Sequence, residues 1–183
     1  RGAAGGERGG KRSRPVQMGG GCGVVPGWIE EHPAGGEVIV LLDSNMAFGT
    51  GEHGTTAMCL GALQEVRREG DTVIDVGCGS GILGIAAAKL GAKRAYLTDI
   101  DPVAVESAAH NAEKNGVEDR VVVALSDLLD DADIRGDVVL ANITAEILAR
   151  LAPDVPKNLK EGGTLILSGI IEDRLPLVKE AFG

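Results

Sequence analysis

The chain has few aromatic residues and few cysteines. Phe, Trp and Tyr make up 2% of its 183 residues, so a folded core must consist of Ala, Val, Ile and Leu, as in parallel sheets covered by helices. The three cysteines, Cys22, Cys59 and Cys78, are odd in number and form no CxxC pair. This pattern argues against a disulfide framework and predicts no metal site, and it fits a reducing cytoplasm.

The chain also has no segment that would span a membrane or direct the protein elsewhere. No apolar run approaches the ~20 residues that a transmembrane helix needs. The charged N-terminal residues are not followed by the apolar segment of a signal peptide. We therefore predict a soluble, cytoplasmic protein without a membrane partner, and the sequence carries no signal for an oligomeric state.

Positive charge is scarce outside the N-terminal segment. The formal net charge is −9, yet residues 1–14 carry five Arg or Lys and one Glu, which leaves 13 basic and 26 acidic residues in the remainder. This balance disfavours a nucleic-acid backbone as a direct partner and suits a basic protein substrate. Acidity also keeps proteins soluble, so both explanations stay open.

Residues 1–23 differ in composition from the rest of the chain. They are rich in Gly and in basic residues and contain almost nothing to bury. We expect a disordered tail or linker here, and one folded domain with a single core in residues 24–183.

Apolar runs alternate with helical patterns through this domain. We predict strands at residues 24–28, 37–43, 72–74, 95–97, 121–125, 138–141 and, after a turn at Gly162 and Gly163, 164–168. Helices are predicted at 57–68 after a threonine cap, behind the glycines that follow Asp75, at 102–115, and between the later strands. Five strands separated by helical segments predict an α/β fold, with a Rossmann-like, doubly wound, mostly parallel sheet. The pattern stops at Gly183 without the final strands of such a sheet, so we expect a C-terminally truncated domain.

The most informative segment is residues 71–101, which read as a strand, a tight turn, a helix and a second strand. Three alternating glycines follow the first strand, and an Ala- and Leu-rich helix begins at once; they are Gly77, Gly79 and Gly81. Glycine adopts positive φ without strain and lets a ligand approach the backbone. The turn therefore presents N–H groups and a helix N-terminus to a polar or anionic ligand.

Acidic residues end both strands of this unit. Asp99 ends the second strand, where a carboxylate can accept hydrogen bonds from both hydroxyls of a ribose, so the sequence predicts a nucleoside-containing cofactor. Gly79, Gly81 and Gly84 also match the dinucleotide pattern GxGxxG, with Asp99 twenty residues after the first glycine. NAD and S-adenosylmethionine both remain possible. Asp75 favours the second, because a carboxylate suits a cationic methionine moiety and repels a pyrophosphate.

Three motifs together resemble one known family. FGTGEHGTT at residues 48–56, DVGCGSGILGIAAAKLGA at 75–92 followed by TDIDPVAV, and VVLANI at 138–143 are similar to the class I S-adenosylmethionine-dependent methyltransferases, and specifically to the ribosomal protein L11 methyltransferase family, PrmA. The resemblance covers about residues 24–182. It implies cofactor contacts by Thr56, Gly77, Asp99 and Asn142.

The chain departs from this family at two points. Gly54 stands where proline is frequent, which removes no contact atom. The family also has a separate N-terminal domain that recognises the ribosomal protein, and here the glycine-rich segment alone precedes Val24. The resemblance implies methyl transfer, and in the family the recognition of the protein substrate depends on that N-terminal domain.

Asn142 is the candidate catalytic residue. It ends the fourth strand beside the predicted cofactor site, where its amide oxygen can accept a hydrogen bond from an amine and orient the nitrogen lone pair. It could instead only cap the helix that follows Ile143. Other polar residues have plainer roles: Asp101 is predicted to cap the helix at 102, Thr56 could cap its own helix, and Cys78 has no partner that would make it a nucleophile.

The sequence thus predicts a protein N-methyltransferase that uses S-adenosyl-L-methionine and modifies lysine side chains and the N-terminal amine of ribosomal protein L11. The predicted cofactor residues are Thr56, Asp75, Gly77, Gly79, Gly81, Asp99 and Asn142. One alternative is an amine methyltransferase that acts on another protein or on a small molecule. A second is an NAD-dependent dehydrogenase, although no Tyr-x-x-x-Lys pair accompanies the glycines.

Overall fold

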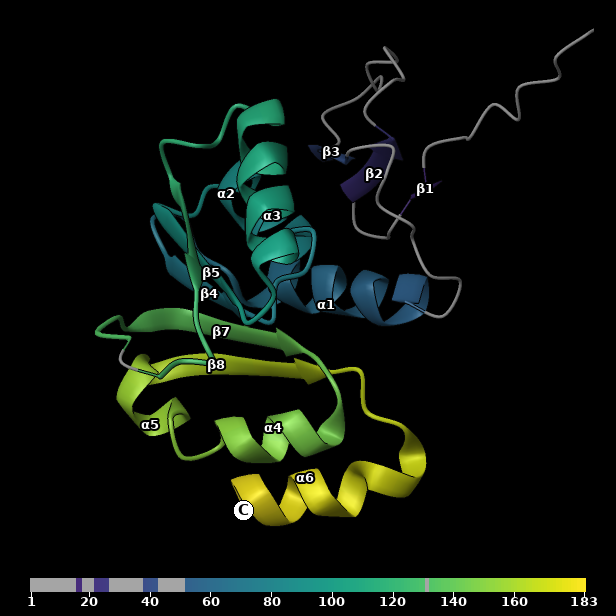
Figure 1. Ribbon diagram of the computed structural model, residues 1–183, viewed down its shortest axis with the longest axis vertical. Coiled ribbons are helices and arrows are strands. Elements are labelled where there is room, and N and C mark those ends of the chain that lie inside the picture. The colour runs from purple at the N-terminus through teal and green to yellow at the C-terminus, as the bar shows by residue number, and fades with distance from the viewer. Residues whose placement is uncertain (1–15, 18–21, 27–37, 43–51, 131) are drawn as a thin grey trace, which may run out of the picture.

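The computed structural model describes residues 16–17, 22–26, 38–42, 52–130 and 132–183 (Figure 1). Its centre is a five-stranded sheet in the order β6-β5-β4-β7-β8, and all neighbouring strands are parallel. The strands are β4 (Thr72–Val76), β5 (Arg94–Asp99), β6 (Val121–Leu125), β7 (Gly136–Asn142) and β8 (Leu159–Ser168). The predicted doubly wound parallel sheet is confirmed.

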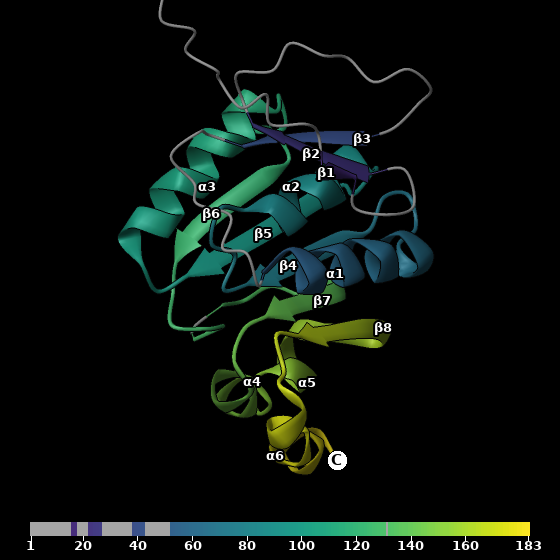
Figure 2. The same cartoon turned by 90° about the vertical axis from the view of Figure 1, so that its right-hand side faces the viewer.

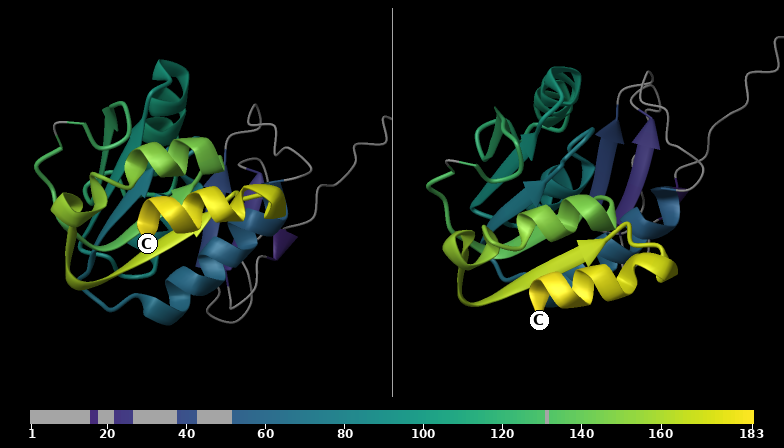
Figure 3. Two further views of the ribbon diagram at one scale, coloured as in Figure 1. Left: turned by 90° about the horizontal axis from the view of Figure 1, so that it is seen from below. Right: turned by 60° about the horizontal axis from the view of Figure 1, so that its bottom comes forward.

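Helices cover both faces of the sheet (Figures 1 and 2). One face is covered by α1 (Glu52–Val66), α2 (Ile82–Lys89) and α3 (Pro102–Lys114). The other is covered by α4 (Ala145–Leu151), α5 (Val155–Asn158) and α6 (Leu175–Phe182), which follows the short 3₁₀ helix η1 (Glu172–Arg174). Figure 3 shows α6 beside α4 on the outer surface. Among the described helices, none is long and apolar enough to cross a membrane.

Two apolar clusters, one on each face, form the core. Neighbouring residues of a strand point to opposite faces, so Val73 packs beneath α2 whereas Ile74 packs toward α4. Among the described residues, the buried apolar side chains are Ala, Val, Ile, Leu and two Cys. Small and branched side chains, in place of aromatic ones, therefore fill the space between the sheet and its helices.

A small sheet of β1 (Val16–Gln17), β2 (Cys22–Pro26) and β3 (Val38–Leu42) lies beside α2 and α3 (Figure 2). Asn115, at the end of α3, binds β3 through its side-chain amide. It accepts a hydrogen bond from the Leu41 N–H at 2.8 Å and donates one to the Leu41 carbonyl at 2.8 Å. Part of the predicted tail thus lies in β1 and β2, while residues 1–15 and 18–21 are outside the described residues.

Several predicted boundaries are wrong. Helix α1 begins at Glu52, so Thr56 lies inside it and does not cap it. No helix separates β6 from β7 among the described residues of that connection. Strand β8 begins at Leu159: Leu159 pairs with Gly136 and Thr164 with Val138, so the expected glycine turn is a bulge within the strand. Gly162 has φ +75°, which this bulge requires.

Candidate functional site

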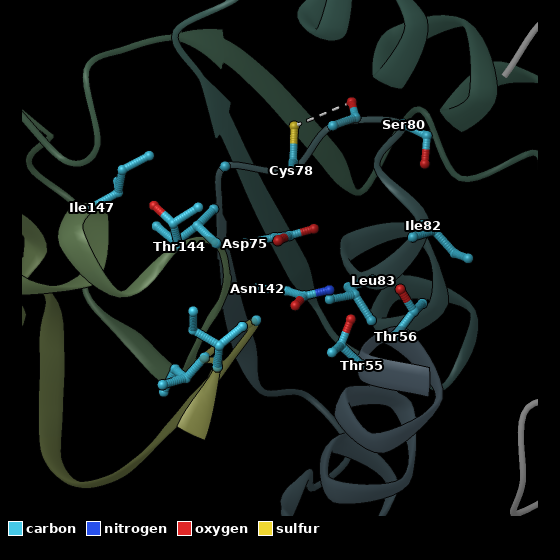
Figure 4. Close-up of a pocket in the computed structure, with 16 residues that line it drawn as sticks. Thr55, Thr56, Asp75, Cys78, Ser80, Ile82, Leu83, Asn142, Thr144 and Ile147 are labelled. Atoms are coloured by element: carbon cyan, nitrogen blue, oxygen red, sulfur yellow. Dashed lines mark hydrogen bonds between the residues drawn. The ribbon is translucent and has the colours of Figure 1, made fainter. Parts of the chain in front are cut away.

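A cavity of about 550 Å³ lies at the carboxyl ends of β4, β7 and β8 (Figure 4). The chain runs from β4 outward to β6 on one side of the sheet and continues from β7 to β8 on the other. This reversal at the β4/β7 boundary is where doubly wound sheets bind ligands. The residues that line the cavity are Thr55, Thr56, Asp75, Gly77, Cys78, Gly79, Ser80, Ile82, Leu83, Asn142, Ile143, Thr144, Ile147, Gly169, Ile170 and Ile171.

One side of the cavity, which we call the glycine wall, is formed by residues 75–83. Gly77, Gly79 and Gly81 all have positive φ, at +68°, +52° and +83°. Gly77 and Gly79 line the cavity, whereas Gly81 packs against Leu97 and begins α2. Gly81 therefore shapes the turn before α2. The sequence analysis includes Gly81 among the cofactor contacts, but Gly81 does not line the cavity.

Asp75 is a buried carboxylate at the base of this wall, with 2% of its surface exposed. Its Oδ2 accepts a hydrogen bond from the Gly84 N–H at 3.0 Å. Burial raises the pKa of the Asp75 carboxyl to about 7, and the charge of Asp99 adds to this rise, although the Gly84 hydrogen bond opposes it. Among the described lining residues, Asp75 is the one acidic or basic side chain, so the cavity suits a cationic group.

Asp99 lies at the end of β5, next to the glycine wall. Its two carboxylate oxygens accept hydrogen bonds from the N–H groups of Gly79 and Asp101, each at 2.9 Å. Asp99 is not among the residues that line the cavity, so the structure places it beside the predicted site and tied to it through Gly79. Asp101 caps α3, as predicted, by accepting a hydrogen bond from the Val103 N–H at 2.9 Å.

Asn111 is a structural residue of the site that the sequence analysis missed. It lies on α3 with 0% of its surface exposed, and its amide nitrogen donates to the Ser80 carbonyl at 2.9 Å. On the strand side, the Cys78 N–H donates to the Thr98 carbonyl at 2.9 Å. Helix and strand thus hold the turn from both sides. An asparagine on the apolar face of an amphipathic helix is the signal that could have identified it.

The opposite side of the cavity follows the ends of β7 and β8. Asn142 is the last residue of β7, pairs with Ser168 of β8 and lines the cavity. Helix α4 begins at Ala145 with Thr144 at its N-cap position, so Asn142 does not cap that helix. The structure thus removes the capping role and leaves the amide available to a ligand.

Ile143 is held between two glycines from different strands. A Cβ on Gly77 would lie 2.6 Å from the Ile143 Cγ2 atom, and a Cβ on Gly169 would lie 2.7 Å from the Ile143 carbonyl oxygen. The Ile143 N–H also donates to the Ser168 carbonyl at 3.2 Å. Close packing of this kind, which depends on glycine at both positions, fixes the backbone directly after Asn142.

The two described cysteines are buried and lie near this site. Burial raises the pKa of the Cys78 thiol well above its usual range, and the negative charge of Asp75 acts in the same direction. Burial likewise raises the pKa of Cys59. Both thiols therefore stay protonated at neutral pH, and Cys78 lacks the thiolate that nucleophilic chemistry needs.

Comparison of the sequence with known proteins identifies its family. A family model described as ribosomal protein L11 methyltransferase (PrmA) matches residues 8–183. The ribosomal protein L11 methyltransferase of Anoxybacillus flavithermus is 49% identical over 171 residues, which cover 93% of this chain and 55% of that protein. This chain spans about half the length of the curated relatives it matches.

Solved structures are similar as well. The crystal structure of ribosomal protein L11 methylase from Lactobacillus delbrueckii subsp. bulgaricus is 36% identical, has a TM-score of 0.85, and the match covers 93% of this chain and 86% of that one. Methanocaldococcus jannaschii Trm5 in complex with adenosine is 25% identical with a TM-score of 0.55, over 64% of this chain and 35% of that one. The chain has the class I methyltransferase fold and belongs to the ribosomal protein L11 methyltransferase family, PrmA.

Proposed function

We propose that the protein transfers methyl groups from S-adenosyl-L-methionine to amino groups of ribosomal protein L11, namely lysine side chains and the N-terminal amine. The observation that supports this most directly is that Asp75 and Asn142 line the same cavity, at the boundary between β4 and β7 where the strand order reverses. The acidic balance of the chain suits a basic protein substrate. Such a reaction would take place in the cytoplasm, where the sequence predicts the protein to be.

The described residues fit the proposed cofactor. Gly77 and Gly79 leave the backbone bare, the buried Asp75 carboxylate suits a cationic methionine moiety, and Asp99 can accept hydrogen bonds from ribose hydroxyls. The hydroxyl of Thr56 lines the same cavity. The similar Trm5 structure is a complex with adenosine, which supports a nucleoside-containing ligand for this fold. When bound, S-adenosylmethionine supplies a methyl group that the positive charge on its sulfur already activates.

The side-chain amide of Asn142 can position the acceptor amine. A lysine amine with an ordinary pKa near 10.4 must lose its proton before it can attack, which costs about 4–5 kcal/mol at pH 7. The Asn142 carbonyl oxygen accepts a hydrogen bond from the neutral amine and directs its lone pair. Asn142 therefore orients the acceptor, while Asp75 retains the cationic part of the cofactor.

Two experiments test the proposal. Equilibrium binding should detect S-adenosylhomocysteine and not NADH, because a pyrophosphate beside Asp75 would be repelled. Radiolabelled S-adenosylmethionine, incubated with purified L11 and with a ribosomal-protein extract, should label L11. NADH binding alone would instead indicate the dehydrogenase alternative, and label on another protein or on a small molecule would change the substrate.

The variant Asn142→Ala tests the mechanism. We expect methyl transfer to fall by about 100-fold or more, since an orienting group for proton or lone-pair chemistry contributes at least that much. The affinity for S-adenosylhomocysteine should change by less than about tenfold, the effect of one lost hydrogen bond. Unchanged turnover would show that Asn142 has no role in the mechanism. Thr144→Ala in the same assay is a neighbouring control, because Thr144 is not one of the predicted cofactor or catalytic residues.

A further inference from the structure

The carboxyl of Asp75 has no positively charged neighbour in the part of the cavity that the structure describes. None of the described lining residues is Lys, Arg or His. Among the described residues, the ionisable groups that interact with this carboxyl are Asp99 at the end of β5, Cys78 in the turn and Cys59 on α1. The cavity residue from β7, Asn142, has an uncharged amide. A negative charge on Asp75 therefore has no counter-ion from these elements.

The carboxyl of Asp75 also has few hydrogen-bond donors. It is 2% exposed, and its one donor among the described residues is the Gly84 N–H of α2, which lies 3.0 Å from Oδ2. A buried carboxylate without a counter-ion is costly, so such a group takes up a proton and becomes neutral. Burial and the charge of Asp99 accordingly raise the pKa of Asp75 to about 7. Below pH 7, Asp75 is therefore mostly the neutral acid unless a cation lies beside it.

The proposed reaction changes the charge of the ligand in this cavity. The methyl donor carries a sulfonium, whereas the product that remains after transfer carries a neutral sulfide. Both ligands also have an ammonium and a carboxylate on the amino-acid moiety, and these two charges cancel. A cation near a buried carboxyl favours the ionised form of that carboxyl. The donor should therefore select ionised Asp75, and the product should discriminate much less between the two forms.

We infer that Asp75 distinguishes the methyl donor from the spent product by exchanging a proton with solvent. Asp75 releases its proton when the donor binds, and its carboxylate then neutralises the sulfonium. During transfer the bond between sulfur and the methyl carbon breaks, its electron pair stays on sulfur, and the lone pair of the acceptor nitrogen forms the new bond. Asp75 then takes up a proton again, because the positive charge has left with the acceptor. This inference rests on the proposed methyl transfer and assigns Asp75 a role in releasing the product.

The first test counts protons by calorimetry on the native chain without an acceptor. S-adenosylmethionine and, separately, S-adenosylhomocysteine are titrated at pH 6.5 in two buffers that differ in ionisation enthalpy. Binding of the donor should release about 0.7 proton, because most Asp75 carboxyls are protonated below a pKa of about 7. Binding of S-adenosylhomocysteine should release less than about 0.2 proton.

The second test measures the pH dependence of affinity. Between pH 5 and 7 the Kd for S-adenosylmethionine should fall by about 50-fold, and the Kd for S-adenosylhomocysteine should fall by less than about fivefold. Asp75→Asn keeps the size of the side chain and its acceptor for the Gly84 N–H, but it should abolish both the proton release and the pH dependence. Asp133→Asn, at an exposed position, is the control and should keep both.

Infrared difference spectroscopy on the native chain identifies the ionising group directly. Addition of the donor at pH 6.5 should remove the carbonyl band of a protonated carboxylic acid, and labelling of aspartate with ¹³C should shift that band. S-adenosylhomocysteine should leave most of the band in place. The band change should be absent in Asp75→Asn and present in Asp133→Asn.

The outcomes separate this inference from the proposed function. If the donor binds without proton release and its Kd is constant between pH 5 and 7, the inference is wrong, and the proposed function stands when the same chain methylates L11. Equal proton release with both ligands, or release that persists in Asp75→Asn, also overturns the inference. If proton release follows the expected pattern and no acceptor is methylated, the inference stands and the proposed function fails. If neither ligand binds, both fail.

Discussion

The two walls of the cavity achieve their shape by different means. The glycine wall is a stretch of backbone that side chains from elsewhere hold by hydrogen bonds, with Asp99 bound to Gly79 and Asn111 bound to Ser80. The other wall consists of aliphatic side chains, and we call it the isoleucine wall: Ile143, Ile147, Ile170 and Ile171. Its first residue, Ile143, packs closely against two glycines. The comparison teaches that substitution should act on the first wall through charge and on the second through volume.

The largest effect should come from the charge of Asp75, measured as the free energy of unfolding without added ligand between pH 4 and 8. The pKa of this carboxyl is raised from 3.8 to about 7 in the folded protein, so between these values the folded state holds a proton that the unfolded chain releases. Stability should therefore be greatest at the acid end and fall as pH rises toward 7, by at most about 4 kcal/mol.

The variant Asp75→Asn should remove this contribution, because an amide does not titrate. Asp133→Asn, at an exposed position, is the matched control and should keep the native pH profile. A native protein whose stability does not fall between pH 4 and 7, or a profile that Asp75→Asn leaves intact, would show that Asp75 is charged in the folded state.

The next effect concerns volume in the isoleucine wall. Gly169→Ala should lower the free energy of unfolding by about 3 kcal/mol, because the added Cβ meets the Ile143 carbonyl oxygen in addition to the strain of a positive φ. Gly162→Ala is the control: it also has positive φ, +75°, but nothing lies within 4 Å of its Cβ position, so it should cost about 1 kcal/mol. Urea unfolding measures both. If both variants lose the same free energy of unfolding, the close packing of Gly169 against Ile143 does not stabilise this wall.

The third effect should be on cofactor affinity. Asp99→Ala removes the carboxylate that we propose binds both ribose hydroxyls, and it removes the anchor of Gly79, so the Kd for S-adenosylhomocysteine should rise about 100-fold in calorimetry. Asp101→Ala removes a helix cap two residues away, so it should cost about 1 kcal/mol of stability and leave the affinity nearly unchanged. A loss of affinity in both variants would mean that the whole segment, and not the Asp99 carboxylate, supports the site.

The sequence predicted the glycine wall well because its determinants are local. Alternating glycines between an apolar strand and a helix can form few structures. Asp75 lies one residue before the end of β4, and Asp99 ends the neighbouring strand β5. Asn142 ends its strand as expected and lines the cavity. The packing of Gly81 against Leu97 was not predicted, because the spacing of glycines does not reveal which side chains approach the turn.

The isoleucine wall could not be predicted, since it depends on which strands become neighbours. Ile143 and Gly169 are distant in sequence and meet only because β8 lies beside β7 with Ser168 opposite Asn142. The bulge at Gly162 sets that register, and the glycine pair instead predicted a turn before the strand. The start of α1 was missed because Gly54, a weak helix former, lies inside the helix.

Helix α3 also links the small N-terminal sheet to the turn of the glycine wall through hydrogen bonds. From β3, an unbroken series of hydrogen bonds runs through Asn115 to the Asn111 carbonyl at 2.7 Å and from the Asn111 side chain to Ser80. One turn of a single helix thus mechanically couples the small N-terminal sheet to the loop that would hold the cofactor.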